Sequence, residues 1–275
     1  MKQLAFVILF AACGHSASPP AAGSGSVGPA SNPGSVKTPA VITLTSAGRD
    51  PRRIVTYTPG DVARNACFTQ DLDAPLGNAT DDGNVFDNSV VLCASWKGAA
   101  GTYAFKNTRA YIGGAHIGED NMSEGEKKVV DGIESVIMKA PPGTASTDKQ
   151  GRIDAVQGGM PTEPSAPILL WTFSVPFPAE SIGIGATWKV QDATPTGHAS
   201  SLDYTLVSLD DRGATVHWKG ALTADALSIP VEGEATLLFT DVLAQSGWET
   251  MELALDPTGK TPPAHTRLVL ADSKP

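Results

Sequence analysis

The chain has 275 residues, a formal net charge of −9 and a pI of about 5.0. A chain of this sign repels phosphate backbones and anionic headgroups, which argues against nucleic acid as a partner and against membrane docking through a basic patch. About 235 residues remain beyond the N-terminal 40, enough for one large core or two small ones.

The N-terminal residues have the layout of a secretory signal. A short basic region precedes an apolar run over residues 4–10, and two alanines then precede Cys13. The run is too short to span a bilayer. It resembles the lipobox of bacterial lipoproteins, with Phe10 where that family usually has leucine. The resemblance implies a signal peptide over residues 1–12 and a lipid on Cys13, which would be the chain's membrane partner. An ordinary signal peptide with a chance cysteine is the alternative.

The residues after Cys13 indicate an address and a tether. Gly14 stands where an aspartate would imply retention in the inner membrane, so the resemblance favours the outer membrane, with the chain facing the periplasm or the surface. Residues 13–40 are rich in Pro, Gly and Ser and poor in large apolar side chains. Such a segment cannot bury a core, and we expect a disordered tether.

The two remaining cysteines, Cys67 and Cys93, are an even pair in an oxidising compartment, which predicts a disulfide between them. Two buried free thiols and a metal site are the alternatives. Neither cysteine has another cysteine or a histidine at metal-ligand spacing.

Short strands are predicted from residue 41 onward. Residues 41–45, 53–58 and 62–69 are rich in β-branched side chains and are separated by turn-forming residues. The stretch 71–88 carries five aspartates among Gly and Asn, and we expect a solvated acidic loop there. A calcium loop is the alternative, but the regular D-x-D-x-D-G spacing and the closing glutamate are missing. Residues 85–96 and 102–112 then predict a hairpin of two longer strands.

Residues 123–140 predict an amphipathic helix. Ser123 and Glu126 form a capping box, and Pro-Pro-Gly after residue 140 ends the helix. In a β-rich chain such a helix usually packs its apolar stripe on a sheet, and a partner-binding helix is the alternative. The predicted stripe consists of Val129, Val130, Ile133, Val136, Ile137 and Ala140.

Three segments of the second half repeat one turn pattern, with Asp three residues before Gly. Asp at the first position of a turn accepts backbone N–H bonds, and a left-handed Gly closes a bulged hairpin. The pattern predicts consecutive antiparallel hairpins. The three pairs are Asp148 and Gly151, Asp210 and Gly213, and Asp256 and Gly259.

The segment from Phe177 to Trp188 has Phe-Pro, an alternating apolar run, and then Gly-x-x-Trp entering a strand. It resembles an F-P-x-x-P-V-x-V-G-x-x-W segment in a family of uncharacterised bacterial lipoproteins, with Ser181 and Ile182 where the family has Pro-Val. The resemblance covers about residues 120–220. It implies an α+β fold dominated by antiparallel sheet and carries over no activity.

No catalytic, metal or cofactor site is predicted. The five histidines are scattered, and no G-x-S-x-G motif is present. Ser146 to Lys149 matches the S-x-x-K motif of penicillin-interacting enzymes, but these residues run into a predicted hairpin turn instead of opening a helix.

We therefore expect an α+β fold, mainly antiparallel β-sheet with one amphipathic helix packed on it. The hairpins could form a curved half-barrel within a globular region over residues 41–275, as one core or as two halves, 41–140 and 141–275. The predicted function is that of a lipid-anchored, non-enzymatic cell-envelope protein that binds a lipid or small apolar ligand. A structural outer-membrane lipoprotein that binds a protein partner is the first alternative, and an envelope hydrolase is the second.

Overall fold

The computed structural model describes residues 40–75, 85–99, 101–116, 124–158, 172–193, 199–224, 227–254 and 263–272. They form a sheet of twelve antiparallel strands, a two-stranded ribbon and the helix α2 (Glu124–Lys139). The predicted mainly antiparallel sheet with a helix packed on it is confirmed. The predicted signal peptide, Cys13 and the tether up to residue 39 lie outside the described residues.

The large sheet has the order β1-β9-β10-β11-β12-β13-β14-β3-β4-β5-β6-β7, and β2 pairs with β8. The bounds are β1 Val41–Ser46, β2 Arg53–Ile54, β3 Val62–Pro75, β4 Val85–Ala99, β5 Thr102–His116, β6 Gly143–Thr147, β7 Ile153–Gly158, β8 Ser181–Ile182, β9 Thr187–Ala193, β10 Ala199–Leu209, β11 Gly213–Ala224, β12 Leu227–Leu238, β13 Asp241–Leu253 and β14 Ala264–Asp272.

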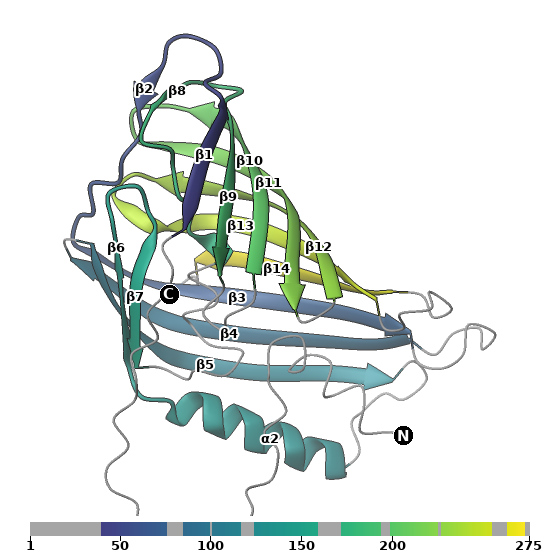
Figure 1. The fold of residues 1–275 in the computed structure, drawn as a ribbon. Helices are drawn as coiled ribbons and strands as arrows, with labels where there is room; N and C mark the ends of the chain where they lie inside the picture. Colours follow the sequence, from purple (N-terminus) through teal and green to yellow (C-terminus); the bar gives the residue numbers. More distant parts are fainter. Residues whose placement is uncertain are drawn as a thin grey trace, which may run out of the picture.

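The sheet is strongly bent. In Figure 1, β3, β4 and β5 form a floor and β9 to β12 rise above it, with β13 and β14 between the two groups. The bend is not closed into a barrel, because β1 and β7 are the edges of the described sheet. The last strand, β14, pairs with the early strand β3, so strands from residues 41–140 and 141–275 belong to the same sheet.

Alternation of side chains gives the sheet an inner face toward the inside of the bend and an outer face. On β10, Ser200, Leu202, Tyr204 and Leu206 are buried, whereas the residues between them are exposed or half-buried. β12 and β14 show the same alternation. This is the pattern expected of an antiparallel sheet with one buried face.

Residues 172–178, here called the inner segment, lie against the inner face. Phe173, Val175 and Phe177 are almost fully buried. The segment is tied to both ends of the sheet, because the Trp188 Nε1 of β9 donates to the Pro176 carbonyl (2.9 Å) and the Phe177 N–H donates to Gln150 O (2.8 Å) in the β6–β7 turn. The inner segment therefore fills the space between the two edges of the bent sheet.

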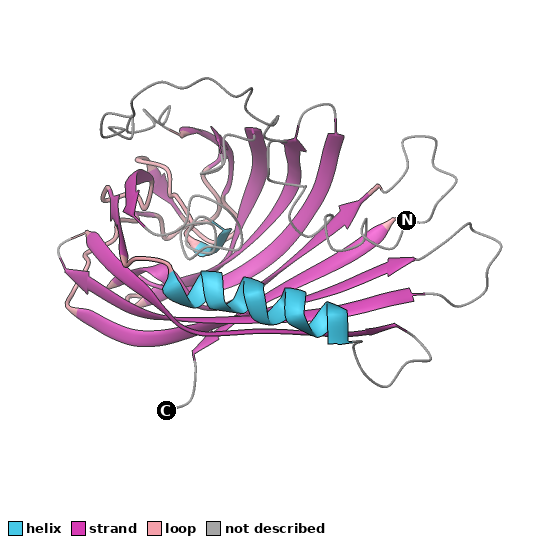
Figure 2. Cartoon of the chain, turned by 90° about the horizontal axis from the view of Figure 1, so that it is seen from below, coloured by secondary structure: helices cyan, strands magenta, loops and turns pink. Residues whose placement is uncertain are grey.

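The helix α2 runs along β5 (Figure 2). The Ile112 N–H on β5 donates to Glu134 Oε1 (2.8 Å), and Asn107 Nδ2 donates to the Ile137 carbonyl (2.9 Å). Strand β6 pairs with residues 102–105 of β5, so these two bonds hold the part of β5 that β6 does not reach. Val136 is 54% exposed and does not join the predicted stripe. Among the helix side chains that the structure describes, Val130, Ile133 and Ile137 pack on the sheet, and that of Val129 is outside this set. Within the described ranges, no helix has the length and apolar content needed to cross a membrane.

The predicted turn at Asp148 joins β6 to β7. Asp148 Oδ1 accepts the N–H groups of Gln150 and Arg152 (2.9 Å each), and Gly151 has φ +84°. A side chain at Gly151 would also meet the Tyr57 ring, so this glycine serves both the turn and the core.

The predicted turn at Asp210 joins β10 to β11. Asp210 Oδ1 accepts the N–H groups of Arg212 (2.8 Å) and Gly213 (2.9 Å). The expected left-handed conformation at Gly213 is wrong, because its φ is not among the positive values. Glycine is needed for close approach instead, since a Cβ there would lie 2.0 Å from Leu237 O. The third predicted turn, 256–259, lies outside the described residues.

Two strand predictions differ from the structure. The expected acidic loop over residues 71–88 is wrong at both ends, because β3 extends to residue 75 and β4 begins at residue 85. Side-chain pairing helps this extension, as Ser89 Oγ donates to Asp71 Oδ1 (2.9 Å). The predicted strand over residues 53–58 is reduced to β2, since Tyr57 turns into the core and donates from its hydroxyl to the Val175 carbonyl (3.0 Å).

The Cys67–Cys93 disulfide is present in the structure and joins directly opposed residues of β3 and β4. Replacing both cysteines with alanine should lower the free energy of unfolding by about 3 kcal/mol, because the bond closes a long loop in the unfolded chain. Urea denaturation measures the loss, and wild type with its disulfide reduced should match the variant. Equal unfolding midpoints for oxidised wild type and the variant would contradict this role.

Candidate functional site

A row of opposed residues crosses the inner face through adjacent strands. Trp188 pairs with Tyr204, Tyr204 with Trp218, Trp218 with Gly233, and Gly233 with Glu249. The first three side chains form an aromatic stack: the Trp188 and Tyr204 rings are 5.6 Å apart and nearly parallel, and the Tyr204 and Trp218 rings are 6.0 Å apart. Offset aromatic pairs contribute roughly 0.5–1.5 kcal/mol each beyond burial, so these contacts add to the stability of the sheet.

Gly233 allows the row to end in a hydrogen bond. Trp218 and Glu249 stand two strands apart, and Trp218 Nε1 donates to Glu249 Oε2 at 2.9 Å. The indole crosses the position of Gly233, where a Cβ would lie 2.4 Å from two of its ring carbons. The contact is therefore possible only because Gly233 has no side chain.

Glu249 is a buried acid on an apolar face. It is 3% exposed, and burial raises its pKa to about 7, with the Trp218 hydrogen bond opposing part of the rise. The pKa of Tyr204 is also raised, first by burial and then by the negative charge of Glu249. At neutral pH the carboxyl group is therefore poised between its neutral and charged forms, while the tyrosine stays neutral.

Glu249 lies next to the part of the inner face that Phe173 covers. One step before it on the inner face of β13 is Gly247, where a Cβ would lie 2.9 Å from the Phe173 ring. One step after it is Met251, which pairs with Val231 on β12 and Thr266 on β14. The inner face is buried on both sides of the carboxyl group, since Val231 and Thr266 are also almost fully buried.

The rows beyond Glu249 are mainly apolar. Strand pairing places one of them across seven strands from β9 to β3, and it has a single hydroxyl group, that of Thr266, among otherwise apolar residues. Most of its residues are buried within the chain, so the row is an apolar band of the inner face. The row consists of Val190, Leu202, Gly220, Val231, Met251, Thr266 and Leu72.

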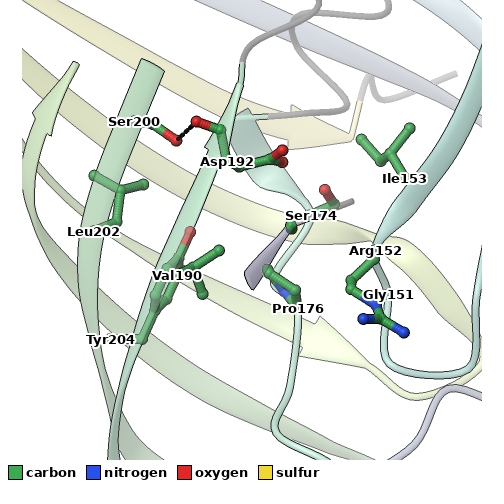
Figure 3. A pocket seen from close by; sticks show the side chains of 11 residues that line it. Gly151, Arg152, Ile153, Ser174, Pro176, Val190, Asp192, Ser200, Leu202 and Tyr204 are labelled. Atoms are coloured by element: carbon green, nitrogen blue, oxygen red, sulfur yellow. Dashed lines mark hydrogen bonds between the residues drawn. The ribbon is translucent and has the colours of Figure 1, made fainter. Parts of the chain in front are cut away.

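The space behind the inner segment is too small for a lipid. Between this segment, β9 and β10 lies a cavity of about 20 Å³, whose lining includes Ser174, Asp192 and Ser200 (Figure 3). Ser200 Oγ donates to the Asp192 carbonyl at 3.3 Å. A volume of this size with polar groups can hold one water molecule. Val190 and Leu202 of the apolar row also line this cavity, so a ligand on the row would not fit at this end of it.

A surface groove of about 420 Å³ at the β2–β8 end is charged but internally balanced. Arg53 Nη1 is 3.0 Å from Asp211 Oδ1, and the guanidinium lies over the Phe239 ring. Arg49 and Arg52 share the groove with Asp50. Exposed pairs of this kind contribute little energy and leave little net charge for an anionic ligand.

The structure does not support the catalytic interpretation of Ser146 to Lys149. Ser146 is on β6 and Asp148 opens the hairpin turn, so the serine is not at a helix N-terminus with the lysine one turn later. Within the described ranges, no group of three or more His, Cys, Asp or Glu residues could hold a metal ion. Cys13 lies outside those ranges. The disulfide joins β3 to β4, whereas Glu249 is on β13. No motif in the sequence pointed to Glu249.

The fold and this face define a class: a mainly antiparallel β-sheet protein with an apolar inner face. No family model and no curated protein sequence matches the chain. Among solved structures, one of lipovitellin, described as showing lipid–protein interactions, is similar to it, with a TM-score of 0.52 and 13% sequence identity. The match covers 79% of this chain and 25% of that chain. At this identity the similarity shows the fold alone.

The need for glycine at position 233 can be tested by substitution. Gly233→Ala should lower the free energy of unfolding by about 1–3 kcal/mol and change the near-UV circular dichroism, because the new methyl group displaces the Trp218 indole. Gly60→Ala is the matched control, since a Cβ there meets nothing within 4 Å. A Gly233 variant as stable as the Gly60 variant would show that the contact is not constrained.

The raised pKa of Glu249 predicts a pH dependence of stability. The folded chain keeps the proton up to about pH 7, whereas an unfolded glutamate releases it near the ordinary pKa of 4.5, so the contribution of this group to stability falls as the pH rises through that window. Relative to Glu249→Gln, wild type should lose about 3 kcal/mol from below to above the window. Urea denaturation at a series of pH values measures the difference.

Glu252→Gln removes an exposed carboxyl group from the same strand and is the matched control. A constant difference between wild type and Glu249→Gln across the window would contradict the raised pKa.

Proposed function

We propose that this chain is a lipid-anchored, non-enzymatic cell-envelope protein that binds a lipid or a small apolar ligand. The ligand would lie on the inner face of the sheet, which would act as a curved half-barrel. The observation that carries the proposal is the apolar row beyond Glu249, which crosses seven strands with one hydroxyl group, that of Thr266, among its side chains.

The fold supports this proposal. The lipovitellin structure with which the chain shares its fold is described as showing lipid–protein interactions. A bent sheet with a buried apolar face is a suitable container for an aliphatic chain, because burial of each CH₂ group contributes about 0.8 kcal/mol.

The predicted lipid on Cys13 would place this face near its ligand. The lipobox over the first residues supports anchoring in the outer membrane, and the tether of residues 13–40 would let the sheet move away from the bilayer surface. Two or three acyl chains on the cysteine would give stable attachment, whereas one would be marginal.

A structural lipoprotein that binds a protein partner is the second candidate. It is favoured by the close filling of the inner face around Phe173 and Phe177, where the described cavity of about 20 Å³ admits only water. In that case the inner face would be entirely core, and the partner would bind elsewhere.

The two candidates differ in what leaves the protein on denaturation. The full chain with Cys13→Ser, secreted without its anchor, should show extra mass in native mass spectrometry that disappears in the denatured spectrum. The extracted ligand should be apolar, because the row beyond Glu249 excludes strongly hydrated groups.

A lipid-free sample then separates binding from chance copurification. Extraction under mild conditions followed by addition of a defined apolar probe should restore a complex of fixed stoichiometry. No extra mass in the native sample and no saturable binding after addition would favour the partner-binding candidate.

A further inference from the structure

Strand β1 is an open edge of the sheet in the described part of the chain. It pairs with β9 on one side, from Val41 opposite Gln191 to Ser46 opposite Thr187. On its other side no described strand adjoins it, and no described loop forms a backbone hydrogen bond with residues 41–46. Every residue of β1 is exposed or half-buried. The N–H and C=O groups that point away from β9 can therefore pair with another strand.

The sequence of β1 lacks the charged residues and proline that usually protect an edge strand. Residues 41–46 read Val-Ile-Thr-Leu-Thr-Ser, and most of them are β-branched, which favours strand pairing. The register with β9 shifts between Leu44 and Ser46 and is regular from Val41 to Leu44. The regular part of β1 is thus an uncharged strand with a free edge.

Alternation along β1 matches a second copy of the same strand. Ile42 and Leu44 are half-buried and pack against the core, whereas Val41 and Thr43 are exposed on the outer face. When two copies run antiparallel about a two-fold axis at Thr43, Ile42 lies opposite the partner's Leu44, and Thr43 lies opposite the partner's Thr43. Opposed residues of an antiparallel pair share a face, so this register joins apolar side chains on the inner side and hydroxyl groups on the outer side.

The charges beside this edge do not oppose such a contact. Thr43 is opposite Lys189 on β9, whose Nζ atom is 3.6 Å from Asp203 Oδ1 on β10. These two charges balance each other on the outer face. Repulsion between the net charges of two whole chains is screened beyond about 8 Å at physiological ionic strength.

We propose that β1 is a self-association edge, on which a second copy of this chain adds its own β1 antiparallel to the first, with Thr43 of both copies at the two-fold axis. The inference goes beyond the proposed function, because it concerns the edge of the sheet and not a ligand on its inner face. One strand pair is a small interface, so the dimer should be weak in solution. Under the proposed anchoring through Cys13, copies on one membrane would meet at a higher effective concentration.

Sedimentation velocity of the full chain carrying Cys13→Ser measures the association. A Kd of roughly 10–500 µM is expected for an interface of this size, so a concentration series that reaches about 500 µM should show a growing fraction of dimer.

Two charge variants test the two-fold contact. Thr43→Glu places two carboxylates opposite each other across the axis, while within its own chain the new side chain faces Lys189. It should weaken association about tenfold or more, and Thr43→Lys should do the same. An equimolar mixture of the two variants should associate at least as well as wild type, because opposite charges then face each other. A folding defect in either variant would not be rescued by mixing.

Val207→Glu and Val207→Lys are the matched controls. Val207 is 47% exposed and lies on β10, two strands from the edge. Both control variants should associate as wild type does, and thermal unfolding checks that all four variants remain folded.

Cross-linking gives a second readout. In an antiparallel pair, directly opposed residues have Cα atoms about 4.5–5.5 Å apart, a distance that a disulfide can bridge. Under mild oxidation, Thr43→Cys in the same chain should therefore form a linked dimer at least tenfold faster than Val207→Cys.

A wild-type chain that stays monomeric over the whole series, with Thr43→Cys linking no faster than Val207→Cys, would overturn this inference and leave the edge to an extended segment of another protein. A dimer that Thr43→Glu leaves intact would overturn it too, because another surface would hold the two copies together. Neither result bears on the proposed apolar ligand, which mass spectrometry tests separately.

Discussion

The pairing of β14 with β3 is the constraint on which the rest of the structure depends. It runs from His265 opposite Asp73 to Asp272 opposite Ala66 and joins strands about 200 residues apart in the chain. Without this pairing, β3 to β7 and β9 to β13 would be separate sheets. With it, the register continues across both groups, and the buried positions of all these strands share one inner face.

A buried ion pair supports this junction from inside the bend. Arg64 on β3 reaches across β14, with its Nε atom 3.4 Å from Asp241 on β13 and its Nη1 atom 3.3 Å from Asp272 on β14. Burial raises the pKa of Asp241, and the positive charge of Arg64 opposes that rise. Such a pair adds little net energy, but removal of one partner leaves a buried charge, which favours this register over shifted ones.

The local parts of the fold were predictable from sequence because their determinants are local. The turn at Asp148, the β4–β5 hairpin and the helix each depend on residues within a few positions of one another. The Cys67–Cys93 pairing followed from an even count. The acidic stretch after residue 70 was wrongly expected to be a loop, since strand pairing with β14 and β4 outweighs the low β-propensity of aspartate.

The candidate site could not be predicted in the same way because its parts come from different strands. Alternation of side chains along a strand places Glu249 on one of its two faces, but nothing in the local sequence shows which face is buried. The contact with Trp218 also depends on Gly233, and a glycine within a strand indicates only that something approaches closely.

A sheet with one apolar face needs a second layer to bury it. In a β-sandwich a second sheet supplies that layer. Here the inner segment supplies it over Gly247 and α2 supplies it along β5. Under the proposed function an aliphatic ligand would have to replace part of this layer, because the apolar row is already buried. Glu249 lies within that buried face with one hydrogen bond from Trp218, so the apolar packing around it must offset the cost of burying a carboxyl group.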